Sequence, residues 1–187
     1  SYYLIEYFKL DMLRPALWIA MNAGEFFEFS IAHDRKYSLD HLWLQLLDDK
    51  EEEITVKIGI SEFIRAEYGD IVRVVLTKPE DDSEFQIEVD ESGEEDEDDT
   101  PRKNSTSGDE LDVDDILMTI RTVDEMLLIN APFPCRILGL NGDVEDNPDL
   151  VNEEAYGDGW CVMVRPHEWD EDMFLNEGEY IEYLNDL

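Results

Sequence analysis

The sequence has little cysteine and little positive charge, and it has no long apolar run. Its two cysteines, Cys135 and Cys161, are too few for a disulfide framework and lack metal-ligand spacing, so we expect buried free thiols. The longest nearly apolar run, residues 15–21, is far shorter than the roughly 20 residues that a membrane-spanning helix needs. The N-terminus also lacks a basic region followed by a hydrophobic stretch. These absences predict a soluble, intracellular protein, with the cytoplasm as the expected compartment.

The shortage of positive charge is large, because 14 Lys and Arg are outnumbered by 49 Asp and Glu, giving a formal net charge of −35. Such a field repels phosphate backbones and anionic lipid headgroups, so neither nucleic acid nor a membrane is an expected partner. The excess is uneven, since residues 80–115 hold 18 acidic and 2 basic residues. Adaptation to high salt would also give an acidic, lysine-poor surface, and the composition leaves that alternative open.

The chain does have enough apolar residues for one packed core. Its 187 residues are 43% hydrophobic, which excludes wholesale disorder and suits one domain with an extension. Residues 1–36 form an aromatic-rich N-terminal extension of uncertain role, which could complete the core or form a dimer contact. A helical stretch is expected around residues 15–21, followed by a strand in which Phe27, Phe29 and Ile31 alternate with polar residues.

The predicted domain comprises residues 37–79 and 113–187. Its residue pattern is that of a mainly β protein with peripheral helices. The expected strands are residues 42–46, 54–58, 71–76, 116–120, 126–129 and 159–164. Residues 122–125 are the expected turn of a hairpin. Ser61 is expected to cap a helix that ends at Gly69, and Asn176 with Glu179 is expected to form a capping box for a C-terminal helix. This pattern predicts a small barrel or sandwich.

An acidic insertion, residues 80–112, separates the two parts of the predicted domain. It contains the acidic run 94–99 and the small polar run 104–108, with hardly any apolar residue after Val89. Such a segment cannot fold alone, so we expect a mobile, disordered loop. Its simplest role is to keep the protein soluble. The alternative is docking to a basic protein surface, tuned by phosphorylation at Ser92 or Ser107.

Several motifs occur in an order and spacing that one known family shares. They are residues 37–44 (YSLDHLWL), 58–61 (IGIS), 69–72 (GDIV) and above all 147–160, where NPDLVNE precedes YGDGW. From about Tyr37 to its end the chain therefore resembles the H protein of the glycine cleavage system. Ala155 replaces the family's usual proline, and Cys135 replaces a usual glycine. The resemblance implies a barrel-sandwich hybrid, the fold of lipoyl and biotinyl carriers, in which short strands form a flattened barrel with helices beside it.

The same resemblance indicates which residue would carry a cofactor. In that family a lysine at a hairpin tip, within E-S-V-K-A, bears lipoamide and shuttles an aminomethyl group between partner enzymes. Counting back from Ala131-Pro132, which matches the A-P after that hairpin, aligns the motif with residues 121–125 and its lysine with Asp124. Lipoate is attached through an amide, which a carboxylate cannot form. None of the six lysines lies beyond Lys103.

The resemblance and the missing lysine together predict an H-protein-like domain that is not lipoylated, holds no cofactor and acts as a non-catalytic protein-binding module. The candidate interaction residues are Arg121, Thr122, Val123, Asp124 and Glu125. The expected partners are proteins, either glycine-cleavage or lipoate-metabolism enzymes or a basic protein surface. The alternative is a working aminomethyl or lipoyl carrier that uses a lysine outside the usual hairpin, with Lys103 as the nearest candidate.

No other motif supports an active site or a metal site. The three histidines lack the spacing of a zinc pair. Residues 143–154 have carboxylates at several positions of a calcium loop, but Pro148 stands where the sharp turn needs glycine. The sequence also lacks a G-x-S-x-G elbow and a phosphate-binding glycine loop. We therefore expect no metal and no enzymatic activity.

Overall fold

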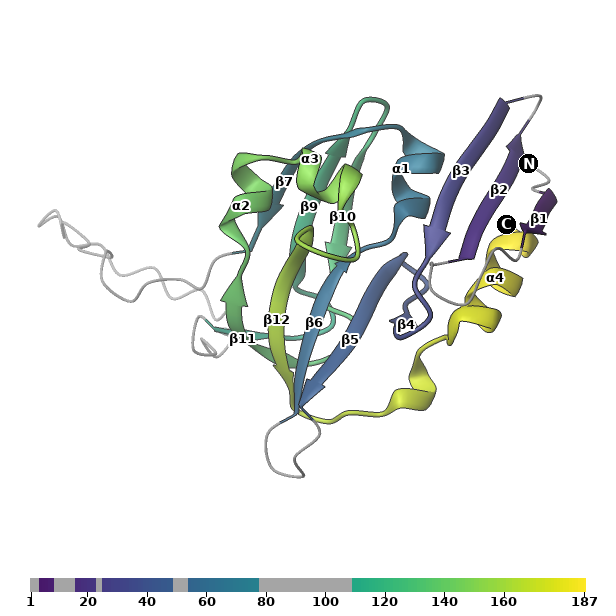
Figure 1. Ribbon diagram of the computed structural model, residues 1–187. Helices are drawn as coiled ribbons and strands as arrows, with labels where there is room; N and C mark the ends of the chain where they lie inside the picture. Colours follow the sequence, from purple (N-terminus) through teal and green to yellow (C-terminus); the bar gives the residue numbers. More distant parts are fainter. Residues whose placement is uncertain (1–3, 9–15, 23–24, 49–53, 78–108) are drawn as a thin grey trace, which may run out of the picture.

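The computed structural model describes residues 4–8, 16–22, 25–48, 54–77 and 109–187, and up to residue 28 it describes the backbone alone (Figure 1). In chain order, the elements are β1 (Leu4–Phe8), β2 (Ala16–Asn22), β3 (Glu25–Ile31), β4 (Lys36–Tyr37), β5 (Leu42–Asp48), β6 (Thr55–Ile60), α1 (Glu62–Tyr68), β7 (Ile71–Leu76), β8 (Glu110–Leu111), β9 (Ile116–Thr122), β10 (Met126–Asn130), β11 (Cys135–Leu140), α2 (Gly142–Asp146), α3 (Asp149–Glu153), β12 (Trp160–Pro166), a 3-10 turn (Glu171–Met173) and α4 (Glu177–Asp186).

Within the described ranges the strands form three antiparallel sheets. The largest has the order β4-β5-β6-β12-β11-β8, the second has the order β10-β9-β7, and the third is β1-β2-β3. The first two sheets contribute to one hydrophobic core, which includes Val56, Ile58 and Val164 of the large sheet and Val74 and Ile120 of the second. The sheets do not close into a barrel. The fold is a mainly β barrel-sandwich hybrid with peripheral helices, as predicted.

A second hydrophobic cluster joins the end of β3 to the C-terminal helix. Phe29 packs edge-on against Phe63 of α1 with ring centroids 5.7 Å apart, and Tyr37 stacks on Tyr180 of α4 at 4.3 Å. The helix α1 lies beside β3 (Figure 1). Ile31 and Phe29 are both buried in this cluster. The last residues of the predicted extension therefore complete the packing of the domain.

Two local predictions are wrong. Residues 16–22 form the strand β2 rather than a helix, and β2 pairs with β1 on one side and with β3 on the other. Ser61 occupies the position before α1, but its side chain makes no capping hydrogen bond and lies instead 2.9 Å from the hydroxyl of Tyr180. In both cases a partner distant in sequence overrides the local preference.

Other local predictions are confirmed. The expected strands 42–46 and 54–58 are present as β5 and β6, which pair with each other. Residues 49–53 between them lie outside the described residues. The capping box of α4 is present, with the backbone N–H of Glu179 donating to Asn176 Oδ1 at 3.0 Å. The expected strand 71–76 is present as β7, and it is half-buried because one face of its sheet is open to solvent.

The acidic insertion falls largely on residues 78–108, outside the described residues. The C-terminal end of the predicted insertion overlaps β8, because Glu110 and Leu111 pair with Arg136 and Cys135 of β11. The expectation of a mobile loop as far as residue 112 therefore does not hold for these residues.

Replacing Phe29 with Ala should lower the free energy of unfolding by about 3–5 kcal/mol, because the lost ring leaves a cavity in the second cluster. Urea denaturation measures this change. The control is Leu39→Ala, since Leu39 is 59% exposed and its truncation should cost less than about 0.5 kcal/mol. Equal effects of the two variants would show that β3 does not belong to the core.

Candidate functional site

The predicted hairpin is present, and its tip, residues 122–125, joins β9 to β10. The backbone N–H of Thr122 donates to the carbonyl of Glu125 at 2.8 Å. The hydroxyl of Thr122 accepts hydrogen bonds from the backbone N–H groups of Asp124 and Glu125, at 3.3 and 3.0 Å. A threonine at this position thus organises the turn through its side chain, as short hydroxyl-bearing residues commonly do.

The hairpin tip rests on the corner between α1 and β7, formed by Gly69 and Asp70. The backbone N–H of Val123 donates to the carbonyl of Asp70 at 3.0 Å. Gly69 has φ 82° and ψ 179°, a conformation that is essentially restricted to glycine. A Cβ on Gly69 would lie 2.4 Å from Cγ2 of Val123. Glycine is therefore required here both by the backbone angle and by the close approach of the tip.

The α1–β7 corner is held in turn by Asn152, the second asparagine of the NPDLVNE motif. Its side-chain amide accepts from the N–H of Ile71 and donates to the carbonyl of Ile71, both at 2.9 Å. Arg65 of α1 donates to the carbonyl of Asn152 at 2.9 Å and to Asp70 Oδ1 at 2.7 Å. Asn152 is thus a positioning residue for the start of β7, and through it for the hairpin tip.

The five predicted interaction residues lie together at this end of the hairpin. Arg121, Val123, Asp124 and Glu125 are exposed, with Val123 at 62%, whereas Thr122 is buried and serves the turn. Residues 121–125 therefore present two carboxylates, one arginine and an apolar side chain to solvent. It contains no primary amine.

The two lysines among the described residues both lie on the large sheet, away from the hairpin. Lys36 in β4 forms an ion pair with Glu171 at 3.1 Å, and Lys57 in β6 lies over the ring of Trp160 at 5.3 Å. Lys103, the lysine of the alternative carrier hypothesis, falls outside the described residues.

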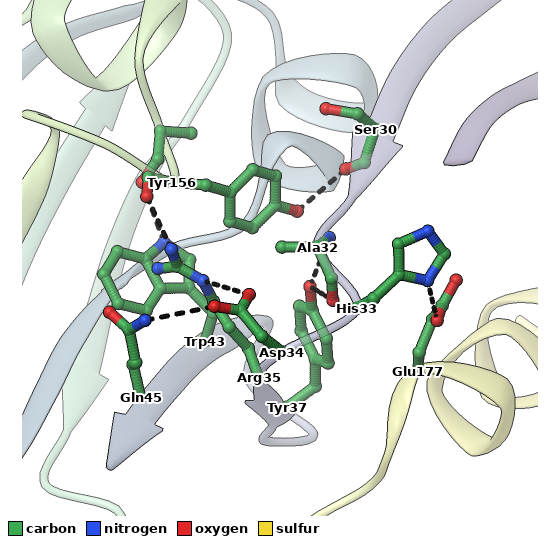
Figure 2. A network of polar contacts seen from close by, with 11 residues as sticks. Ser30, Ala32, His33, Asp34, Arg35, Tyr37, Trp43, Gln45, Tyr156 and Glu177 are labelled. Atoms are coloured by element: carbon green, nitrogen blue, oxygen red, sulfur yellow. Dashed lines mark hydrogen bonds and ion pairs between the residues drawn. The ribbon is translucent and has the colours of Figure 1, made fainter. Parts of the chain in front are cut away.

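A second polar network ties the segment after β3 to the loop before β12 (Figure 2). The guanidinium of Arg35 lies 4.2 Å from the ring centroid of Trp43 and donates to the carbonyl of Tyr156 at 2.7 Å. The indole N–H of Trp43 donates to the carbonyl of Ala155 at 2.9 Å, and the hydroxyl of Tyr156 donates to the carbonyl of Ser30 at 2.8 Å. These contacts hold the loop that contains Ala155 and Tyr156 against the rest of the fold, and we assign them a structural role.

The side chains of His41, Ser61 and Tyr180 meet in the interior, an arrangement that no sequence pattern indicates. The hydroxyl of Tyr180 lies 3.0 Å from Nδ1 of His41 and 2.9 Å from Oγ of Ser61. Burial lowers the pKa of His41 from 6.5 to about 4 and raises the pKa of Tyr180. The imidazole is therefore neutral at physiological pH. Because Ser61 is buried, the cluster is structural rather than nucleophilic.

The cysteines are buried and free, as predicted. Burial raises the pKa of Cys135 and of Cys161 to about 12, so both remain protonated and unreactive at neutral pH. Within the described ranges, no three His, Cys, Asp or Glu side chains lie together as metal ligands would. Glu145, one of the calcium-loop candidates, instead accepts a hydrogen bond from the N–H of Leu76 at 2.9 Å.

In the part of the chain that the structure describes, no helix is long and apolar enough to span a bilayer.

Comparisons with known proteins agree on one family. The family model described as glycine cleavage H-protein matches residues 102–187. A probable glycine cleavage system H protein of Natronomonas pharaonis is 29% identical over 152 residues, which cover 81% of this chain and 94% of the relative. A glycine cleavage system H protein of Oceanobacillus iheyensis is 28% identical, covering 84% of this chain and 99% of the relative.

A solved structure supports the fold independently. The crystal structure of a glycine cleavage system H protein from Mycobacterium marinum superposes with a TM-score of 0.59 at 22% identity. The match covers 84% of this chain and 100% of that chain.

Replacing Gly69 with Ala should lower the free energy of unfolding by roughly 2–4 kcal/mol, because the strained φ and the overlap with Val123 each cost about 1–3 kcal/mol. NMR should show the largest shift changes at the hairpin tip. Gly142→Ala is the control, since nothing lies within 4 Å of its Cβ position. An unchanged tip in Gly69→Ala would contradict the proposed support.

His41 should make the protein acid-sensitive. The unfolded chain binds a proton at His41 near pH 6.5, whereas the folded protein does so only near pH 4. Protons therefore favour the unfolded state as the pH falls from 6.5 to 4, and stability is lost in that window. Urea unfolding at pH 7 and pH 5 should show a smaller loss for His41→Asn, because asparagine tolerates the positive φ of 62°. An equal loss in the variant would refute this role.

Proposed function

Because the chain belongs to the glycine cleavage H-protein family, we propose that it is a member without a lipoyl group that acts as a non-catalytic protein-binding module. One observation carries the proposal, namely that residues 121–125 end the hairpin with carboxylates and without an amine. In this proposal Asp124 occupies the position of the family's carrier lysine. An amide to lipoate cannot form there.

The geometry of the hairpin supports a binding role. The backbone of the tip is fixed by the hydrogen bond between Val123 and Asp70 and by the hydroxyl of Thr122. A fixed tip loses little conformational entropy when a partner binds, so its exposed side chains can contribute directly to affinity. A lipoyl arm moves between active sites and carries a chemical group, whereas these side chains can only bind a partner that touches the tip. We therefore assign the tip a recognition role rather than a transfer role.

The partners in this proposal are proteins, because the relatives are named as H proteins of the glycine cleavage system, and the resemblance implies a protein that works between partner enzymes. The exposed Val123 beside Asp124 and Glu125 would fit an apolar pocket with basic residues at its rim. The first candidate partners are glycine-cleavage and lipoate-metabolism enzymes. More generally, the partner would be any protein with a basic surface that fits the tip. The binding unit would comprise residues 37–79 and 113–187 together with the end of β3 and the strand β8, which pack with them, while the remaining residues of 1–36 and 80–112 would be extension and insertion.

An attempt to lipoylate the protein in vitro tests the proposal. With lipoate ligase, ATP and lipoate, the wild type should keep its intact mass, whereas Asp124→Lys should gain one lipoyl group, because only the amine is missing from the hairpin. Glu125→Lys is the matched control, since it adds a lysine one position away, and it should stay unmodified.

Two results would count against the proposal. A lipoyl group on the wild type, mapped to Lys103 or to another lysine, would identify a working carrier. Failure of Asp124→Lys to be modified, while a known H protein is modified in parallel, would show that Asp124 does not occupy the carrier position.

A further inference from the structure

The sheet β10-β9-β7 packs one face on the core and leaves the other face to solvent. Two neighbouring rows cross the open face, one made of Met126, Arg121 and Arg73 and the other of Leu128, Thr119 and Val75. We call these six residues the arginine face. The alternate residues Ile120, Val74 and Ile129 are buried on the opposite side. The face begins next to the hairpin tip and runs along all three strands.

The arginine face is apolar around its two charges. Met126 is 65% exposed, Leu128 is 58% exposed and Val75 is 39% exposed. Apolar side chains that lie together on a protein surface with polar neighbours commonly mark an interaction site. In a chain with 49 acidic residues, an open sheet face that carries no acidic side chain in either row is unexpected.

Arg73 and Arg121 lie directly opposite each other on neighbouring strands. Neighbouring strands are about 4.8 Å apart, and like charges placed directly opposite destabilise a sheet. Neither arginine has an ion pair or side-chain hydrogen bond within the described residues. Other bases there do have acidic partners, namely Arg35 with Asp34, Lys36 with Glu171, Arg65 with Asp70 and Arg136 with Asp109. The register thus places two like charges opposite each other, an arrangement that a carboxylate bound between them would stabilise.

We propose that the arginine face docks a polypeptide segment of a partner protein in which carboxylate side chains alternate with apolar ones. The carboxylates bridge Arg73 and Arg121, since an arginine binds a carboxylate through two parallel hydrogen bonds. The apolar side chains of the segment cover Met126, Leu128 and Val75. This inference does not depend on the absence of lipoate, because a lipoylated protein would have the same face.

The charge of the whole chain limits the partner further. A net charge of −35 repels an anionic molecule at long range, so the partner is neutral or basic outside the docking segment. Nucleic acid is disfavoured because its phosphates are closely spaced along its whole length. A two-fold contact between two copies through this face is disfavoured as well, because it would bring the arginine pairs of both copies together.

The test is an NMR titration of the full chain with two synthetic peptides. In the first, glutamate alternates with leucine and lysines at both ends make the net charge zero, and in the second glutamine replaces every glutamate. The first peptide should shift the resonances of the arginine face and the second should bind at least fivefold more weakly. Arg73→Gln and Arg121→Gln should each weaken binding of the first peptide at least fivefold. The control Arg136→Gln, which changes an arginine already paired with Asp109, should not.

A second readout separates docking from a structural role. If the opposed arginines repel each other, Arg73→Gln should raise the urea midpoint of the free protein while it weakens peptide binding. A lower midpoint would identify Arg73 as a structural residue and overturn the proposal. Shifts confined to other surfaces, or equal binding of both peptides, would overturn it too. Tighter binding of an oligonucleotide than of the first peptide would also overturn the proposal. A dimer of the free protein that Arg121→Gln dissociates would do so as well.

Discussion

The hydrogen bond from the backbone of Val123 to the carbonyl of Asp70 is the constraint on which the candidate site depends. It fixes the tip of one hairpin on the corner that follows α1, and Gly69 makes that approach possible. The corner is fixed in turn by the side chain of Asn152, which pairs with both backbone groups of Ile71. Asn152 of the NPDLVNE motif thus helps to determine where the hairpin tip lies, because it fixes the start of β7, on which the tip rests.

With the tip held in this way, its chemistry depends on which side chains it carries. A primary amine at an exposed, fixed tip can be acylated and can carry a long arm, whereas a carboxylate can only attract or repel. In our proposal, Asp124 and Glu125 stand at the tip in place of an amine, so the hairpin keeps its shape but cannot carry the arm. The neighbouring sheet face adds a second feature. Arg73 and Arg121 lie opposite each other there, although the chain has 49 acidic residues that could have served as ion-pair partners. Both features favour recognition of another protein over chemistry.

The sequence predicted the elements whose signals are local. The hairpin 116–129 has alternating apolar residues around a polar turn, and the capping box of Asn176 and Glu179 needs only four residues. Residues 16–22 were misassigned because an apolar run does not distinguish helix from strand, and pairing with β1 and β3 decides the outcome. The opposition of Arg73 and Arg121, and the meeting of His41, Ser61 and Tyr180, depend on residues far apart in sequence. Only the register of the sheets and the packing of α4 reveal them.

The central claim is that this chain retains the shape of a lipoyl carrier but carries no lipoyl group. The most direct measurement is the intact mass of the protein isolated from its own cells, where its natural ligases and partners are present. The account predicts the mass of the unmodified polypeptide throughout the population. A population that bears one lipoyl or aminomethyl-lipoyl group, on any lysine, would contradict it.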